Sequence, residues 1–235
     1  MIPPLIVSEA LSKGIHLIAI SDHNATANVN AVMKAASGSN LTVLPGIEIQ
    51  TKEEVHVLCL FDTLEQMEHT QAYVTENLPA LKNDPNIFGE QFVVDETGEF
   101  IRREDQLLIT SANITIEELF FFINKVRGLA IPAHVDRSAF GLLANLGFVP
   151  SGIQVEALEI SRNLNPADIP TKFPQISGFP IIQGGDASRL NEILGANLFT
   201  INEPTIAEIV MALRKENGRS VDLRPWKVDK THIWA

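Results

Sequence analysis

The sequence predicts an α/β protein built on a largely parallel sheet. Short apolar segments alternate with amphipathic segments along most of the 235 residues, and the apolar segments are nearly continuous. Strands of this kind are typical of a parallel sheet that is buried on both faces. A chain of this length can bury a sizeable core as one barrel. We therefore expect a single barrel domain over residues 1–235.

The elements follow one another in a regular order. Proline at the start and glycine at the end of the first helix are the expected asymmetry of a helix. Helices are predicted for residues 3–14, 26–37, 64–78, 115–128 and 205–218. Strands are predicted for residues 15–20, 41–49, 55–61, 129–134, 157–161, 179–186 and 197–201.

Two segments depart from this alternation. Residues 79–113 are polar, are too long for an ordinary connection, and contain the hairpin pattern "VVDETGEFI". We expect this segment to be an insertion at the barrel mouth. Residues 219–235 are predicted to be an irregular tail that packs Trp226 or Trp234 on the barrel.

The composition limits the partners that we expect. The formal net charge is −11, whereas proteins that bind a nucleic-acid backbone are usually basic, so we expect no such partner. A small phosphorylated molecule fits better, because a bound metal would reverse the local field. All apolar runs are shorter than about 18 residues, so we expect no membrane helix and a cytoplasmic protein. The single cysteine, Cys59, is expected to be a buried thiol.

Charged and polar side chains follow the predicted strands. Asp22 and His23 follow the first strand, Glu48 lies near the end of the second, and His134 and Asp186 follow two later strands. The carboxyl ends of barrel strands share one rim. Imidazoles and carboxylates that meet there can bind a divalent cation.

His56 lies instead at the start of its strand. It returns to the same rim as Glu48 if that strand runs antiparallel to the preceding one after the short turn "TKEE". A hydrogen-bonded core histidine is the alternative for His56, and an ordinary turn residue is the alternative for His23. Glu48 is predicted to be functional, because a buried glutamate needs a partner.

The remaining candidates have structural alternatives as well. Asp22 is expected to hold the ring of a metal ligand in place. Asp186 could instead cap the helix that follows it. Arg137, Arg162 and Arg189 follow strand ends, so they are either phosphate-binding residues or surface ion-pair partners.

Four motifs in order resemble the PHP family, named for polymerase and histidinol phosphatase. They are "AISDHN", "PGIEIQTKEEVHVLCLF", "IPAHVDR" and "GGDAS", and the resemblance extends from about Pro3 to about Arg214. The second and third motifs are particularly similar to a group of metal-dependent phosphoesterases. The resemblance implies a distorted seven-stranded (β/α) barrel of the TIM type that holds up to three divalent metals.

The resemblance also implies roles for individual residues. Glu48 would bridge metals, and His56 and His134 would share one metal with it. Asp186 would serve a second metal and His23 a third. Zinc, manganese or iron would activate a water and polarise a phosphate ester, with Glu48, His134 and Asp186 as the catalytic set.

The chain departs from the family pattern in two places. The family's first strand, which ends in His-x-His, is absent, and Ser188 stands where the last motif has histidine. About one metal site is therefore expected to be complete, and the barrel edge is expected to be open, which would allow an oligomer. The sequence favours a hydrolase of small phosphorylated metabolites or nucleotides, impaired in this short chain. The alternatives are a non-catalytic regulatory protein that binds a metal or a phosphorylated ligand, and a pure interaction protein.

Overall fold

The fold was analysed in a computed structural model, which describes residues 1–225. The predicted contacts of Trp226 and Trp234 lie outside this range. None of the described helices is long and apolar enough to cross a membrane. The elements are, in order, α1 (Pro3–Ser12), β1 (Leu17–Ile20), α2 (Val29–Ala35), β2 (Thr42–Gln50), β3 (His56–Leu60), α3 (Leu64–Asn77), α4 (Pro85–Phe88), β4 (Phe92–Val94), β5 (Phe100–Arg103), α5 (Ile116–Lys125), β6 (Leu129–Pro132), α6 (Leu142–Asn145), β7 (Leu158–Ile160), α7 (Ile169–Lys172), β8 (Ile181–Gln183), β9 (Asn197–Thr200), α8 (Ile206–Arg214) and β10 (Ser220–Leu223), with 3₁₀ turns at Pro166–Asp168, Pro174–Ile176 and Leu190–Glu192.

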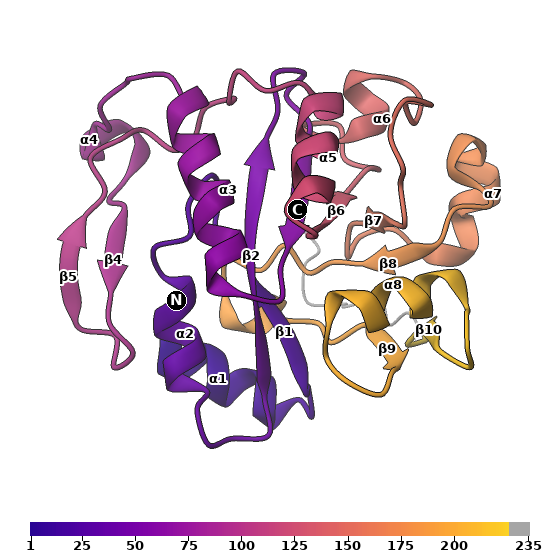
Figure 1. Cartoon of the computed structure of the whole chain (residues 1–235), viewed down its shortest axis with the longest axis horizontal. Helices are drawn as coiled ribbons and strands as arrows, with labels where there is room; N and C mark the ends of the chain where they lie inside the picture. The colour runs from indigo at the N-terminus through magenta and orange to yellow at the C-terminus, as the bar shows by residue number, and fades with distance from the viewer. Residues whose placement is uncertain (226–235) are drawn as a thin grey trace, which may run out of the picture.

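The central sheet has four strands in the order β1-β2-β3-β6 (Figure 1). β1 and β2 are parallel, whereas β2 and β3, and β3 and β6, are antiparallel. The sheet is therefore mixed rather than parallel, although the direction expected for β3 is confirmed. The turn from β2 to β3 closes with a hydrogen bond from Thr51 N to Val55 O (2.9 Å), and a connection this short cannot make a parallel crossover.

The later strands extend the sheet by individual contacts. The backbone N–H of Val135, just after β6, donates to the carbonyl of Glu159 in β7 (2.8 Å). β7 and β8 are parallel. Asn197 at the start of β9 imitates strand pairing, because its side-chain amide receives the N–H of Gln183 (2.9 Å) and donates to its carbonyl (3.1 Å).

The described strands do not close into a barrel. β1 ends one sheet and β9 ends another, and no strand within residues 1–225 lies between them. β9 pairs with β10, so part of the tail that was expected to be irregular, Ser220–Leu223, is a strand. The fold is therefore a mixed α/β arrangement that is open on one side.

Helices α3 and α5 cover the face of the central sheet that is toward the viewer in Figure 1. The amphipathic pattern of α5 places Leu119, Phe120 and Ile123 in the main core, against apolar side chains from β2 and β3. α8 covers a second cluster, in which Ile209 and Leu213 join apolar residues of the central sheet. Cys59 is buried in the core as expected.

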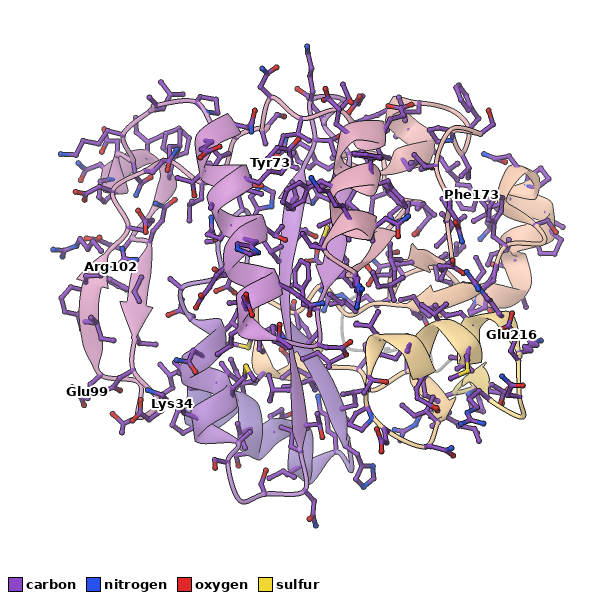
Figure 2. The ribbon with its side chains drawn as sticks, viewed as in Figure 1. Lys34, Tyr73, Glu99, Arg102, Phe173 and Glu216 are labelled. Carbon is purple, nitrogen blue, oxygen red and sulfur yellow. The ribbon has the colours of Figure 1, made fainter. Side chains whose placement is uncertain are left out.

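The segment 79–113 contains the expected hairpin, formed by β4 and β5 at the edge of the molecule; Figure 2 labels Glu99 and Arg102 on it. A carboxylate oxygen of Asp95 accepts hydrogen bonds from the N–H groups of Thr97 and Glu99 (2.9 Å each), which fixes the turn. Asn28 attaches the hairpin to the rest of the fold. Its side chain receives the N–H of Val94 (3.0 Å) and donates to a carbonyl of β4.

Replacing Asn197 by alanine should lower the free energy of unfolding by about 1–3 kcal/mol, because two backbone groups of Gln183 lose their partners. Exposed Asn86 is the matched control, and Asn86→Ala should change stability by less than about 0.5 kcal/mol. Urea unfolding measures both changes. Equal stabilities of the two variants would show that β8 does not depend on this side chain.

Candidate metal centre

Glu48 lies on β2, which has β1 along one edge and β3 along the other. Residues 42–45 pair with β1, and residues 46–50 pair with β3. Gly46 stands at the change, where an added Cβ would lie 2.9 Å from the carbonyl oxygen of Ile20. The close approach of three strands at this glycine directs Glu48 into the space at the end of β1.

His23 reaches Glu48 because the pairing of β1 continues past its last residue. Glu48 N donates to Asp22 O (3.2 Å), and Asn24 N donates to Glu48 O (2.7 Å). These two hydrogen bonds place His23 directly opposite Glu48. Asn24 is fully buried and has φ +51°, a conformation that asparagine adopts more easily than most residues. Its side chain also donates to the carbonyls of Leu108 and Thr110, so these hydrogen bonds fix the turn formed by residues 21–24.

His56 and His134 approach the same carboxylate from β3 and β6. Antiparallel pairing brings the start of β3 beside the end of β6, and Ala133 N donates to His56 O (2.9 Å). His134 has φ +31° and an exposed fraction of only 1%. The left-handed turn directs its ring toward Glu48.

Three imidazoles therefore surround one carboxylate. Glu48 Oε2 lies 3.0 Å from Nδ1 of His23 and 3.1 Å from Nδ1 of His56, while Glu48 Oε1 lies 3.6 Å from Nε2 of His134. Burial alone would raise the pKa of Glu48. The contacts with His134, His23 and His56 outweigh burial and hold that pKa well below its usual value.

The donor set fits a divalent cation. His23, Glu48 and His56 each offer a ligand atom within 4.8 Å of the others. Nε2 of His23, Nε2 of His56 and Nδ1 of His134 are buried without a hydrogen-bond partner in the described part of the chain. Buried polar atoms are nearly always paired, and imidazole with carboxylate suits zinc, manganese or iron. The cluster supports a divalent metal, and its chemistry does not select one ion.

The arrangement differs from the expected distribution over three metals. His23 was assigned to a separate metal, yet its ring contacts the same carboxylate oxygen as His56. Asp22 and Asp186 are not in the compact cluster, although both line the adjoining cavity together with Glu48. The imidazoles thus lie closer together around Glu48 than expected. The carboxylates of Asp22 and Asp186 lie outside this cluster, along the adjoining cavity.

Asp22 and Asp186 have other contacts. Burial raises the pKa of Asp22, and the hydrogen bond from Asn28 (3.4 Å) opposes that shift only in part. Asp186, which has φ +41°, forms an ion pair with Arg137. The predicted phosphate-binding residue Arg137 therefore lies at the site, held by a predicted metal ligand.

The other two arginines are placed by Glu192. Arg162 Nη2 lies 2.9 Å from Glu192 Oε1, while Glu192 Oε2 receives the backbone N–H of Arg189 (2.9 Å). Ser188 also donates its N–H to Glu192 (2.9 Å). Glu192 thus fixes the loop after Asp186 and engages Arg162 in an ion pair.

Glu159 in β7 is a site residue that the sequence analysis missed. Its Oε1 accepts the N–H of His134 (3.3 Å), so it supports the strained turn. Gly184 makes room for it, because an added Cβ there would lie 2.2 Å from the Glu159 carboxyl carbon. Burial raises the pKa of Glu159 to about 7, although nearby His134 favours the charged form. The signal was a glutamate between two apolar residues of a short strand.

Phe140 is the second residue that was missed. Its ring stacks on His56 with 4.8 Å between centroids and 10° between planes, and its carbonyl accepts the N–H of His56 (3.1 Å). Phe140 lies in the irregular segment after Arg137 and has φ +59°. No strand or helix pattern surrounds it, so only the folded chain reveals this contact.

Solved structures share this fold, although no family model and no curated protein matches the chain. The lesion-specific endonuclease PfuEndoQ from Pyrococcus furiosus matches with a TM-score of 0.69 and 20% identity over 94% of this chain and 53% of that one. This chain thus spans about half of the endonuclease. An amidohydrolase from Chromobacterium violaceum (TM-score 0.55, 16% identity, 91% and 92% coverage) also matches, as does a structure described as a metal-dependent phosphoesterase from Bifidobacterium adolescentis (0.51, 17%, 79% and 82%).

The comparison overturns one expectation. Endonuclease Q, in complex with a 27-mer duplex that carries an abasic lesion at its active site, shares the fold with a TM-score of 0.70 and 20% identity. The expectation of no nucleic-acid partner rested on the net charge of −11 and is therefore wrong as a rule for this fold. Net charge describes the whole surface, whereas the cluster around Glu48 is a local feature. The fold is shared with an endonuclease, an amidohydrolase and a structure described as a metal-dependent phosphoesterase.

Proposed function

We propose that the chain is a divalent-metal-dependent hydrolase of phosphate esters, of the PHP type. The observation that carries the proposal is the Glu48 carboxylate within reach of His23, His56 and His134, each of which keeps an unpartnered ring nitrogen. Core histidines without a functional role usually satisfy both ring nitrogens. The shared fold with a phosphoesterase and an endonuclease supports the same reaction class.

The residues of the chain have separate tasks in this proposal. Glu48, His56 and His134 would hold the metal together with His23, and a bound divalent cation would supply Lewis-acid stabilisation of charge on the phosphate oxygens. Glu159 keeps His134 oriented through its backbone N–H. Asp186 positions Arg137, and we assign its guanidinium the binding of a phosphate oxygen. Phe140 packs on the ring of His56 and limits the access of water to it.

The substrate class extends beyond small metabolites. We include nucleic-acid phosphodiesters, because the endonuclease that shares the fold acts on DNA. The exposed arginines of the hairpin, Arg102 and Arg103, are paired with Glu104 and Glu90, so the hairpin offers little free positive charge. A short or locally distorted phosphodiester therefore fits this chain better than a long duplex tract.

A non-catalytic role is the second candidate. The ion pair of Arg137 with Asp186 and that of Arg162 with Glu192 are the observations that favour it, because both guanidiniums already have a carboxylate partner. Such a protein would bind a metal and a phosphorylated ligand without turnover. Metal binding with no hydrolysis would distinguish this role from that of an enzyme.

The purified chain should hydrolyse bis(p-nitrophenyl) phosphate or an oligonucleotide with an abasic site when manganese or zinc is added. A chelator should stop the reaction, because the phosphate charge then loses its Lewis acid. Glu48→Gln keeps the side-chain size and removes the shared anion, so it should lower the rate by at least about 100-fold. Rates that are equal in the wild type and Glu48→Gln would refute the enzymatic proposal.

Metal content can be predicted separately from activity. About one tightly bound divalent ion per chain is expected in the wild type, and elemental analysis after gel filtration measures it. His56→Ala should weaken binding by more than about 100-fold, because a direct ligand is lost. His69 on α3 is exposed and provides the matched control, His69→Ala. Unchanged metal content in His56→Ala would show that the cluster is not the metal site.

Arg137→Ala should raise KM for a phosphate ester by about tenfold or more, as expected for the loss of a charged hydrogen bond. Arg102→Ala, on the hairpin, is the control and should leave KM unchanged. Steady-state kinetics with both variants separates KM from kcat. A fall in kcat at constant KM in Arg137→Ala would mean that Arg137 acts on the transition state alone.

A further inference from the structure

The β4–β5 hairpin carries a pair of exposed aromatic rings. Phe92 and Phe100 are 47% and 57% exposed, and their ring centroids are 5.7 Å apart with 89° between the planes. The central guanidinium carbon of Arg103 lies 5.7 Å from the centre of the Phe92 ring and 5.8 Å from that of Phe100. Apolar groups that remain exposed together on one surface are typical of sites that bind another molecule.

A β-bulge brings the two rings to the same face of the hairpin. Along the ladder, Phe92 is opposite Arg103. Val94 is opposite Phe100, so Ile101 is the extra residue of the bulge. In a regular ladder Ile101 would be opposite Val94, and Phe100 would point to the other face. Bulges are frequent beside active sites, where they redirect a side chain.

The hairpin is bound to the end of β1 beside the metal centre. The side-chain amide of Asn28 donates to the carbonyl of Phe92 (3.1 Å) and to the carboxylate of Asp22 (3.4 Å). One amide therefore spans the distance between β4 and the residue that precedes His23. The rings thus belong to a strand that is held next to the candidate site.

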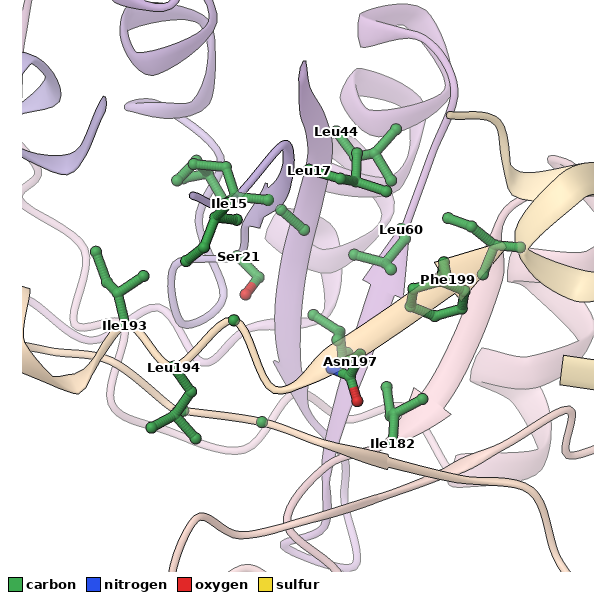
Figure 3. A pocket seen from close by; sticks show the side chains of 18 of the residues that line it. Ile15, Leu17, Ser21, Leu44, Leu60, Ile182, Ile193, Leu194, Asn197 and Phe199 are labelled. Carbon is green, nitrogen blue, oxygen red and sulfur yellow. The ribbon is translucent and has the colours of Figure 1, made fainter. Parts of the chain in front are cut away.

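Two cavities within the described residues adjoin the metal centre. The larger has a volume of about 770 Å³, lies between β1 and β9, and has apolar side chains on both sides of its opening (Figure 3). The smaller, of about 290 Å³, is lined by His23, Glu48 and Asp186 and also by Val94. Because Val94 is opposite Phe100, the aromatic face of the hairpin continues into the smaller cavity.

We propose that the face formed by Phe92 and Phe100 binds an unpaired nucleobase of the substrate, next to the phosphate at the metal centre. This inference rests on the proposed hydrolysis of phosphodiesters and names the group that the site recognises. Bases stack on aromatic side chains whatever their sequence. A paired base has its faces covered within the duplex, so an unpaired base fits the rings better.

The charge of the hairpin agrees with stacking. Arg103 forms an ion pair with Glu90, so the face offers rings rather than a free cation for a phosphate backbone. An apolar side chain of a protein partner would also cover the rings, but it would not occupy the cavity that joins them to the metal centre. A nucleotide occupies both places with one ligand.

Calorimetry with the manganese-loaded chain tests the base site. The probe is deoxyadenosine 5′-monophosphate, and 2-deoxyribose 5-phosphate is the matched control without the base. The nucleotide should bind about tenfold more tightly or better, the usual contribution of one stacked base. Phe92→Ala and Phe100→Ala should each reduce this ratio by about threefold or more, whereas Phe121→Ala, on the exposed face of α5, should leave it unchanged.

The same ratio separates the base site from the proposed hydrolysis. A preference for the nucleotide in a chain that hydrolyses no phosphodiester would contradict the hydrolysis and leave the base site in place. Hydrolysis of a phosphodiester together with equal binding of the two phosphates would contradict the base site alone. Binding of neither phosphate would contradict both.

Two further results would overturn the location. Phe199 lines the larger cavity, so loss of the preference in Phe199→Ala rather than in Phe100→Ala would place the base there. A dimer in light scattering that dissociates in Phe100→Ala would identify a second copy of the chain as the occupant of the aromatic face. Circular dichroism checks that all variants are folded.

Discussion

The shared carboxylate of Glu48 is the interaction on which the arrangement of the site depends. A buried anion costs several kcal/mol unless it has partners, and here His23, His56 and His134 supply them. Each imidazole comes from a different strand end, so the carboxylate joins β1, β3 and β6 at one point. The central sheet cannot shift its register without separating this cluster.

Gly46 makes that junction geometrically feasible. An added Cβ at this position would lie 2.9 Å from the carbonyl oxygen of Ile20 and 3.2 Å from that of Cys59, so a side chain there would push β1 and β3 away from β2. The mixed sheet follows from the short turn between β2 and β3, which cannot make a parallel crossover. This turn places β3 antiparallel, which returns His56 to the rim where Glu48 lies. A fully parallel sheet would have placed His56 at the opposite end.

Local patterns in the sequence were sufficient for part of this site. Glu48 was recognised as a buried charge within an apolar strand, and the short turn after it allowed an antiparallel β3 that would return His56 to the same rim. Glu159 was missed because its importance depends on Gly184, a residue of another strand that makes room for its carboxylate. Phe140 was missed because it reaches His56 from an irregular segment. Both contacts join parts of the chain that no sequence window contains.

The open side of the sheet was expected from the comparison with the family motifs, and local strand patterns alone do not predict it. Each strand of the predicted barrel was identified close to its observed bounds, yet closure depends on whether the first and last strands meet. Asn28 illustrates the same limit on a smaller scale. Asparagine there is compatible with a helix cap, but its side chain instead binds the backbone of the β4–β5 hairpin, far along the chain.

Four of the eight non-glycine residues with positive φ in the described part of the chain lie at or beside the site. They are Asn24, His134, Phe140 and Asp186, with φ angles between +31° and +59°. For residues other than glycine and asparagine, such a conformation costs on the order of 1–3 kcal/mol and persists only when surrounding contacts fix it. Those contacts are present here: Glu159 receives the N–H of His134, and Arg137 pairs with Asp186. An extended backbone at His134 would point its side chain away from Glu48, whereas the left-handed conformation points it toward Glu48. The residues with positive φ therefore lower the local stability of the chain around the cluster. The buried apolar core that contains β2 and β3 offsets this cost.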